Sequence, residues 1–368
     1  MFIKNLSVVN FKNYEEATFD FSPQINCLVG DNGSGKTNIL DAIYYLGNCK
    51  SYFNPIDKQN IRHEEKFFVL SANFKIDDRL DKINCGVKIG QKKVFKRNDK
   101  IYDRLTDHIG KYPVVIITPN DIDLIKEGSE IRRKFFDSII AQNNKTFLNN
   151  LINYNKVLLQ RNNLLKHFAR EKTFQYDSLE IWDLKLAELG EKIHLERKFF
   201  EKQFNPIFNN LYQHICGELE RGTIVYTSDC SSNSFIEILN SSLQKDRILQ
   251  RTSKGIHKDE YRFEIDSHSV KKFGSQGQQK SFLIALKLAQ FLFIKEHHQI
   301  TPILLLDDIF DKIDDKRVSH LMKLVNENTF KQIFITDTHH GRIPELFASI
   351  ESEMKIFQIE KGHVLIPD

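Results

Sequence analysis

Apolar residues in the first 120 positions gather in short runs that are separated by turn residues. Runs of this length, bounded by turns, are typical of buried strands. They lie at residues 25–29, 67–74, 83–89 and 114–117. The pattern predicts that the chain opens with a strand-rich part.

The period of the apolar positions changes between Ile131 and about Ile215. Apolar side chains recur every three or four residues within residues 148–168 and again within residues 182–215, which predicts long amphipathic helices. Neither pattern sustains heptads long enough for an extended coiled coil. Pro206 is expected to interrupt the second helix, because proline lacks the N–H that a helix interior needs.

Strand-like runs return in the last third of the chain, at residues 223–227, 303–306, 332–336 and 355–359. An α/β pattern therefore brackets a helical insertion. We expect an α/β fold in three segments: a first part at residues 1–120, a helical lobe at residues 121–222 and a second part at residues 223–368.

Composition excludes several broad classes of protein. The 368 residues are 40% hydrophobic and 28% charged, which is ordinary for a globular protein and argues against disordered or fibrous classes. No apolar run approaches the ~20 residues that cross a bilayer, and polar residues break the start too early for a signal peptide. We therefore expect a cytoplasmic protein with no membrane partner. The net charge of +4 decides little by itself.

The cysteines form an odd and scattered set with no C-x-x-C pair. This usage argues against a disulfide framework and against a zinc site. All five are expected to be reduced, namely Cys27, Cys49, Cys85, Cys216 and Cys230.

The most informative motif follows the apolar run at residues 25–29. Residues 30–37 match the phosphate-binding pattern G-x-x-x-x-G-K-S/T and precede a helical pattern that includes Ile39 and Ile43. Backbone N–H groups of such a loop point at phosphates, while its lysine reaches the β and γ phosphates and its hydroxyl can bind Mg²⁺. The expected ATP ligands are Gly30, Asp31, Asn32, Gly33, Ser34, Gly35, Lys36, Thr37 and Asn38.

A carboxylate on a strand beside the loop is needed to hold the metal. The run at residues 303–306 ends in Asp307 and Asp308. We expect Asp307 to bind Mg²⁺ together with Thr37, and Asp308 to polarise the attacking water while Lys36 assists the reaction. The alternatives are a chance glycine-rich turn, which would match in roughly 3% of chains of this length, and an ordinary acidic turn after a core strand.

The segment at residues 274–279 reads Gly-Ser-Gln-Gly-Gln-Gln and stands ahead of a helical pattern, just before the strand at 303–306. In this order it resembles the signature loop of ABC and SMC-type ATPases, which implies an ATPase head with an inserted helical lobe. The resemblance implies that Ser275, Gly277 and Gln278 contact the γ-phosphate held by a second copy, so that ATP joins two heads. Residues 309–314 similarly resemble the D-loop, with Asp314 in the position of its aspartate.

Segments spread along the whole chain resemble the DNA replication and repair branch of the SMC-like ABC ATPase family; they lie at residues 6–14, 26–46, 118–137 and 255–260. The chain departs from that branch at Ile256, Lys258 and Glu260, and Tyr52 stands where an arginine is common. The equivalents of the Q-loop glutamine and the switch histidine are not assigned; Gln59 and His339 are the candidates.

The resemblance implies an ATP-dependent DNA-binding protein of recombinational repair, replication restart and the SOS response. It implies a homodimer that closes on duplex DNA near gaps or junctions without reading sequence, and a weak DNA-dependent ATPase whose slow hydrolysis releases the DNA. It also implies cooperation with RecO and RecR, and through them with RecA.

Basic clusters offer weaker support for DNA binding. One consists of Lys92, Lys93, Lys96 and Arg97 on a hairpin that turns at Gly90, and the other of Arg132, Arg133 and Lys134 at the start of a helix. Either cluster could neutralise phosphates. Solvated charged faces are an equally good reading of each cluster taken alone.

Two other functions stay open from the residues. One is the nucleotide-binding subunit of an ABC transporter, and the other is an ATP-binding scaffold with little turnover. Asp308 favours slow turnover, because it stands where ABC enzymes usually carry the longer glutamate. Hydrolysis measured with and without gapped DNA separates the readings.

Overall fold

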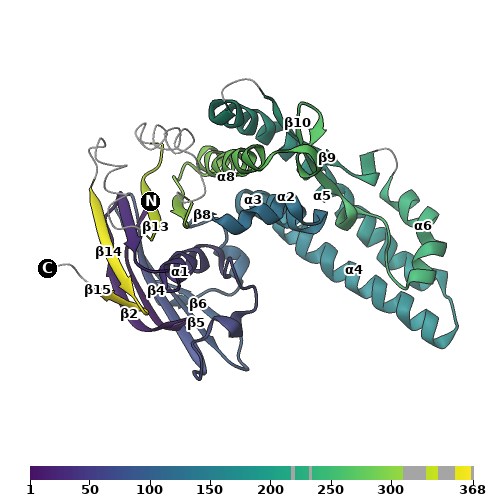
Figure 1. The fold of residues 1–368 in the computed structure, drawn as a ribbon. Helices are drawn as coiled ribbons and strands as arrows, with labels where there is room; N and C mark the ends of the chain where they lie inside the picture. Colours follow the sequence, from purple (N-terminus) through teal and green to yellow (C-terminus); the bar gives the residue numbers. More distant parts are fainter. Residues whose placement is uncertain (217–219, 232–233, 310–328, 339–352, 366–368) are drawn as a thin grey trace. The chain divides into compact units, whose positions relative to one another are not determined.

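The computed structural model of the chain describes residues 1–216, 220–231, 234–309, 329–338 and 353–365 (Figure 1). Packing divides the chain into two units. The first unit holds residues 1–121 and 286–368, and the second holds residues 122–285.

A six-stranded sheet in the first unit carries the phosphate-loop motif. Its order is β15-β14-β3-β13-β12-β8, and every neighbouring pair is parallel except β14 with β15. All residues of β3, β8, β12 and β13 are buried, which explains why most of them are apolar. The buried polar residues Asn26 and Gln332 are hydrogen-bonded. The strands are β3 (Ile25–Val29), β8 (Val114–Ile117), β12 (Ile303–Leu306), β13 (Gln332–Asp337), β14 (Met354–Glu360) and β15 (His363–Leu365).

A second six-stranded sheet in the first unit is antiparallel, in the order β2-β1-β4-β5-β6-β7. Buried and more exposed residues alternate along β4, as expected for a sheet with one face on the core. The strands are β1 (Phe2–Phe11), β2 (Tyr14–Asp20), β4 (Phe67–Ile76), β5 (Arg79–Lys88), β6 (Val94–Arg97) and β7 (Lys100–Ile101).

Helix α1 (Lys36–Asn48) joins the two sheets of the first unit into one core. Its Ile39, Leu40, Ile43 and Leu46 are fully buried in a cluster that includes side chains of both sheets. Figure 1 shows α1 beside β4 and β5. This packing fixes the start of α1, and therefore the motif that precedes it, on the end of β3.

The second unit is mainly helical. Helix α4 runs along α5, and α5 also packs on β9 of a small antiparallel sheet with the order β11-β10-β9 (Figure 1). The larger helices are α3 (Ser129–Asn143), α4 (Lys145–Glu171), α5 (Tyr176–Cys216), α6 (Phe235–Leu249) and α8 (Gln276–His298), the last of which continues past the unit boundary. The strands are β9 (Gly222–Thr227), β10 (Glu260–Ile265) and β11 (His268–Ser269).

Short helices complete the described elements: α2 (Asp123–Lys126), α7 (Val270–Phe273), η1 (Asp57–Asn60), η2 (Leu105–Asp107), η3 (Pro119–Ile122), η4 (Asp229–Ser231) and η5 (Ile256–Lys258). The described cysteines are all free. Within the described residues, no helix is long and apolar enough to cross a membrane.

Two details differ from the sequence expectation. The strands β9 and β10 belong to the helical unit rather than to the segment that carries β12, because they pack on α5 and α3. Helix α5 continues through Pro206 instead of being interrupted there. Pro206 is exposed, so the backbone carbonyl that loses its helix partner can be hydrated, while buried Phe204 and Phe208 hold the helix on either side.

Candidate functional site

The phosphate-loop motif connects the end of β3 to the first residue of α1. Gly30 has a φ of 149° and Gly35 a φ of 120°, a region that side chains with a Cβ rarely adopt. A Cβ on Gly30 would also lie 2.2 Å from the carbonyl oxygen of Ile359, on β14. Glycine is therefore required at Gly30 by both the backbone conformation and the neighbouring strand.

The ammonium group of Lys36 lies inside the loop. Its Nζ donates to the carbonyl oxygens of Gly30 at 2.7 Å and Asp31 at 2.9 Å, and the residue is only 4% exposed. Ser34 Oγ is buried and has no hydrogen-bond partner within the described residues. Asp31, Asn32 and Gly33 face solvent, and a Cβ built on Gly33 meets open space. The inner side of the loop is thus packed against the protein, and its outer side is open to solvent.

Two turns that the sequence analysis did not single out hold the loop in place. Asn13, in the turn between β1 and β2, donates from Nδ2 to the Ser34 carbonyl at 3.0 Å, and the Gly362 N–H donates to the same oxygen at 2.9 Å. Asn38 donates to Asn13 Oδ1 at 2.7 Å. Asn13 and Gly362 are residue types that favour turns, so the sequence could indicate the turns. It could not indicate that these turns contact the loop.

The predicted metal ligands meet in the structure. Thr37 Oγ1 donates to Asp307 Oδ1 at 2.8 Å, although the two residues are 270 positions apart. The expectation that β12 neighbours β3 needs correction, because β13 lies between them. Thr336 at the end of β13 fills this gap by hydrogen bonding to Asp307 Oδ1 and to Asp308 Oδ1, each at 3.0 Å.

Asp307 and Asp308 occupy different environments. Burial raises the pKa of Asp307 to about 6; hydrogen bonds from Thr37 and Thr336 and the charge of Lys36 oppose the rise, and the charge of Asp308 adds to it. Asp308 is less buried and has a positive φ of 45°, so the chain turns sharply after the strand. One carboxylate therefore faces the loop within the protein, and the next is more open to solvent.

The donor set fits Mg²⁺ with a phosphate ligand. Thr37 and Asp307 supply the oxygen ligands that Mg²⁺ prefers, and a site that also uses substrate phosphates needs few protein ligands. The unpartnered Ser34 hydroxyl and the open side of Gly33 leave room for phosphate oxygens.

The predicted signature residues form the start of α8. Ser275 N donates to Gln278 Oε1 at 2.8 Å, and Gln278 N donates to Ser275 Oγ at 3.2 Å. This reciprocal pair is a capping box. Gln278 Nε2 also donates to Glu220 Oε1 at 2.8 Å, and Ser281 donates to the carbonyl of Gly277 at 3.1 Å. The signature segment is therefore a fixed helix N-terminus within the second unit.

Some predicted residues lie outside the described residues. Asp314 of the predicted D-loop and His339 are among them, and Ile309 is the last described residue of the D-loop segment. Gln59 lies exposed in η1.

Tyr52, at a position where the resemblance predicts arginine, lies in a group with Lys287 and Asp121. The Tyr52 hydroxyl donates to Asp121, and Lys287 Nζ lies 2.9 Å from the Tyr52 oxygen and 2.8 Å from Asp121 Oδ1. Both charged side chains of this group are 2% exposed. The group fastens α8 to the start of η3 inside the first unit.

The first basic cluster, on the hairpin of β5 and β6, is partly occupied by structural contacts. Lys93 pairs with Asp57 at 3.0 Å, and Arg97 pairs with the buried Asp81 at 3.1 Å. Lys92 is exposed and Lys96 is half-buried. Two of the four cations therefore hold the fold.

The second basic cluster, at the start of α3, behaves in the same way. Arg132 donates to Glu260 at 2.5 Å, and Arg133 donates to the Asp259 carbonyl at 2.6 Å. Lys134 forms an exposed pair with Glu130 at 2.6 Å. The two arginines hold α3 against the segment around η5.

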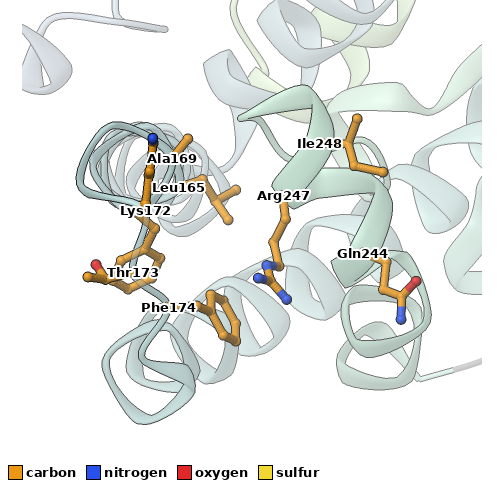
Figure 2. A pocket seen from close by; sticks show the side chains of 9 residues that line it. Leu165, Ala169, Lys172, Thr173, Phe174, Gln244, Arg247 and Ile248 are labelled. Atoms are coloured by element: carbon orange, nitrogen blue, oxygen red, sulfur yellow. The ribbon is translucent and has the colours of Figure 1, made fainter.

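A pocket of about 500 Å³ lies in the second unit, between the C-terminal end of α4 and α6 (Figure 2). The Arg247 guanidinium lies over the Phe174 ring at 4.0 Å from its centroid. None of the pocket's residues belongs to the predicted site. Its remaining lining residues are Leu165, Phe168, Ala169, Lys172, Thr173, Gln244 and Ile248.

The sheet with its loop, α1 and the two aspartates define a P-loop protein with a head of the SMC type. The family model for the RecF/RecN/SMC N terminal domain matches residues 2–364. An SMC head domain from Pyrococcus furiosus has the same fold, with a TM-score of 0.54 and 16% identity over 99% of this chain and 95% of that one.

Comparison with curated proteins shows which branch of the SMC-like ATPases the chain is most similar to among these relatives. The chain is 54% identical to the DNA replication and repair protein RecF of Flavobacterium johnsoniae over 98% of this chain and 100% of that protein. It is 45% identical to the DNA replication and repair protein RecF of Phocaeicola vulgatus over 99% of this chain and 98% of that protein. A solved structure of the recombination mediator protein RecF with ATP has a TM-score of 0.90 and 29% identity over 99% of this chain and 97% of that one. The chain belongs to the RecF family of SMC-like ATPases.

Proposed function

We propose that this protein is an ATP-dependent DNA-binding protein of replication and recombinational repair. ATP binds at the loop from Gly30 to Thr37, and closure of two copies around ATP holds duplex DNA near a gap or junction. The observation that carries the proposal is the hydrogen bond of 2.8 Å between Thr37 and Asp307, which joins the loop to the acidic end of β12. Family membership and the RecF structure with ATP support it.

Each residue of the loop has a role in this proposal. Backbone N–H groups inside the loop, from Gly33 to Thr37, surround the phosphates, and the N-terminus of α1 adds its dipole. The N–H groups of Gly30 and Asn38 donate instead to the carbonyls of Asp337 and Gly35. Lys36 exchanges its bonds with the Gly30 and Asp31 carbonyls for the β and γ phosphates. Thr37 and Asp307 would hold Mg²⁺, which would supply positive charge to the phosphates.

Hydrolysis requires a group that orients water toward the γ-phosphorus. Asp308 follows Asp307 directly and is the more accessible of the two carboxylates. Its carboxylate accepts a proton from the attacking water as the new bond to phosphorus forms and the bond to the bridging oxygen breaks, which gives ADP and phosphate. Because aspartate is one methylene shorter than glutamate, we propose slow turnover that is stimulated by DNA.

The signature residues act on a second copy. Ser275, Gly277 and Gln278 begin α8 in the second unit, whereas the phosphate loop belongs to the first. The cap uses the N–H groups of Ser275 and Gln278, which leaves those of Gln276 and Gly277 in the first turn for an anion such as the γ-phosphate of ATP held by a partner. Asp314 would contribute to the same contact. ATP thereby becomes the link between two copies.

The proposed partners follow from family membership. The solved RecF structures are described as belonging to the RecFOR pathway, and we propose that this chain likewise works with RecO and RecR, and indirectly with RecA. DNA contact is by phosphates rather than bases, so no sequence preference is expected. We assign it to the two cations of the first basic cluster that the fold does not pair within the described residues, namely Lys92 and Lys96.

The test is steady-state ATP hydrolysis with and without gapped duplex DNA, with binding of the same DNA measured at matched salt with and without ATP. The parent should hydrolyse ATP slowly and faster with DNA, and it should bind DNA more tightly when ATP is present. Lys36→Ala should lose both effects. DNA binding that is indifferent to ATP and to Lys36→Ala would exclude the proposed function, and hydrolysis that is indifferent to DNA would favour a transporter-type subunit.

A further inference from the structure

Helix α5 carries an apolar stripe on its solvent side. Ile181, Leu184, Leu195 and Phe199 are each between 56% and 64% exposed. Their separations of three, eleven and four residues keep them on one side of a helix, since eleven residues make about three turns. The opposite side of α5 is already used, because it buries residues such as Leu186, Ile193 and Phe200 in the second unit.

Charged residues on the same side of α5 are arranged about Gly190. Asp177 and Glu188 lie before Gly190, and Lys192 and Lys202 lie after it. All four are exposed, and Glu188 pairs with Lys192 of its own helix at 2.6 Å. Lys185 and Glu191 are also exposed at the edges of this side, but Lys185 lies over the Trp182 ring and Glu191 accepts from the Phe235 N–H. The four other charges are therefore acidic before Gly190 and basic after it, with two apolar residues between the charges of each half.

This arrangement is self-complementary about the level of Gly190. Glu188 and Lys192 lie two residues on either side, and Ile181 and Phe199 lie nine residues on either side. Leu184 and Leu195 lie six residues before and five after, and Asp177 and Lys202 lie thirteen before and twelve after. Two antiparallel copies of α5 that meet at Gly190 would thus place apolar residues opposite apolar residues and acidic residues opposite basic ones.

We propose that this α5 face pairs with the same face of a second copy of the chain, with the two helices antiparallel about a two-fold axis near residue 190. Such an interface is isologous, so every contact occurs twice. In a parallel pairing at the same register, Glu188 would oppose Glu188 and Lys192 would oppose Lys192, which is unfavourable. None of these residues belongs to the nucleotide site, so the contact does not require ATP and does not rest on the proposed clamp.

A single pair of helices buries less than the roughly 1,200 Å² of a standard interface, so the contact is expected to be weak. Sedimentation equilibrium of the full chain without nucleotide should show a reversible dimer that becomes populated above about 100 µM. Leu195→Asp should raise the dissociation constant at least tenfold, because it places a carboxylate in an apolar contact. Leu80→Asp, at an exposed leucine of β5, is the matched control and should leave the dimer unchanged.

Charge reversal tests the direction of the helices. Glu188→Lys should weaken the dimer, and the added change Lys192→Glu should restore it, because the antiparallel pair then meets with both signs exchanged. Oxidative cross-linking gives a second readout. Positions 181 and 199 are about 27 Å apart along one helix, so Ile181→Cys mixed with Phe199→Cys should cross-link while either variant alone should not.

Each outcome decides the proposal. A parent that stays monomeric at several hundred micromolar, or a Leu195→Asp variant that dimerises like the parent, overturns it. Cross-linking of either single-cysteine variant alone, beyond the background of the parent's native cysteines, contradicts the antiparallel arrangement. A different protein that binds the monomeric parent and is lost in Leu195→Asp assigns the face to that protein instead. Repeating the series with Lys36→Ala separates this contact from ATP-driven closure, since only the latter should disappear.

Discussion

The consecutive residues Asp307 and Asp308 have different surroundings, which suit the different roles that we propose for them. Asp307 is 5% exposed and shares a hydrogen-bonded group with Thr37 and Thr336, whereas Asp308 sits at the turn after the strand. A metal ligand benefits from fixed geometry, and a group that accepts a proton from water needs access to it. These environments support the proposed assignment of the two roles.

Asp308→Asn tests this division of tasks. The amide keeps the size of the side chain but cannot take the proton, so ATP hydrolysis should fall by at least about 100-fold. Binding of ATP with Mg²⁺ should stay within about threefold of the parent, while Asp307→Asn should weaken Mg²⁺-dependent binding. Isothermal calorimetry with ATP and single-turnover hydrolysis measure the two effects. Normal hydrolysis in Asp308→Asn would remove Asp308 from the mechanism.

Burial of His108 is expected to make the stability of the fold depend on pH. It is fully buried, and burial lowers its pKa to about 4, although the hydrogen bond with the Leu46 carbonyl opposes this shift. Between pH 6.5 and 4 the unfolded chain binds a proton at this residue that the folded chain does not bind, so stability rises with pH in this window. The contribution is fully present above pH 6.5 and is lost as the pH falls toward 4.

The expected size is about 1 kcal/mol between pH 7 and pH 5.5 for this residue. Urea unfolding at the two pH values should show a drop for the parent that exceeds the drop for His108→Asn by about this amount. Equal drops in both proteins would show that His108 does not titrate in this way.

At the N-terminus of α8, substitutions of Ser275 can distinguish its role in capping the helix from its proposed role in ATP-dependent dimerisation. Ser275→Ala should cost about 1 kcal/mol of stability through the lost cap. Ser275→Asp keeps a good cap but brings a negative charge to the face proposed to meet the γ-phosphate. Its unfolding midpoint should match the parent, while ATP-dependent dimerisation falls by at least about tenfold. A Ser275→Asp variant that dimerises normally with ATP would place the signature contact elsewhere.

Strands and local motifs were predictable from the sequence because their signals are local. The buried run at residues 25–29 became β3, and the run at 303–306 became β12. The order in which the strands pair could not be predicted, because an apolar run does not show which strand lies beside it. The position of β13 between β3 and β12 was missed for this reason. The prediction that Pro206 interrupts the helix was wrong, because Pro206 lies on the exposed face of α5 and the buried face on either side of it is held by packing.

The site shows the same limit. The Thr37 contact with Asp307 could be proposed from two motifs whose roles are known in combination. The contacts of Asn13 and Gly362 with the loop could not, since they depend on how two separate turns pack against it. Likewise, Lys93 and Arg97 look like phosphate ligands in the sequence, but their partners Asp57 and Asp81 are brought to them only by folding.

At the scale of the whole molecule, the cations that remain open predict how DNA binding responds to salt. Lys92→Glu with Lys96→Glu should weaken DNA binding for every sequence and lower the slope of log K against log salt by about 0.9 for each lost phosphate contact. Lys93→Ala should mainly lower stability, because it breaks the pair with Asp57. Fluorescence anisotropy across a salt series checks both. An unchanged slope in the double variant would move the DNA surface away from this hairpin.

The phosphate loop belongs to the first unit and the signature loop to the second, and the two are linked along the chain by α8. We propose that ATP completes the site between two copies. In this proposal nucleotide controls assembly as well as hydrolysis.

The most direct measurement is the mass of the protein on gapped DNA, by multi-angle light scattering, with ATP and Mg²⁺. Asp308→Asn should give a stable complex of two copies with ATP and one copy without it, at concentrations below those at which the α5 face associates. Lys36→Ala should remain a single copy in both conditions. One copy of Asp308→Asn in the presence of ATP and DNA would contradict the account.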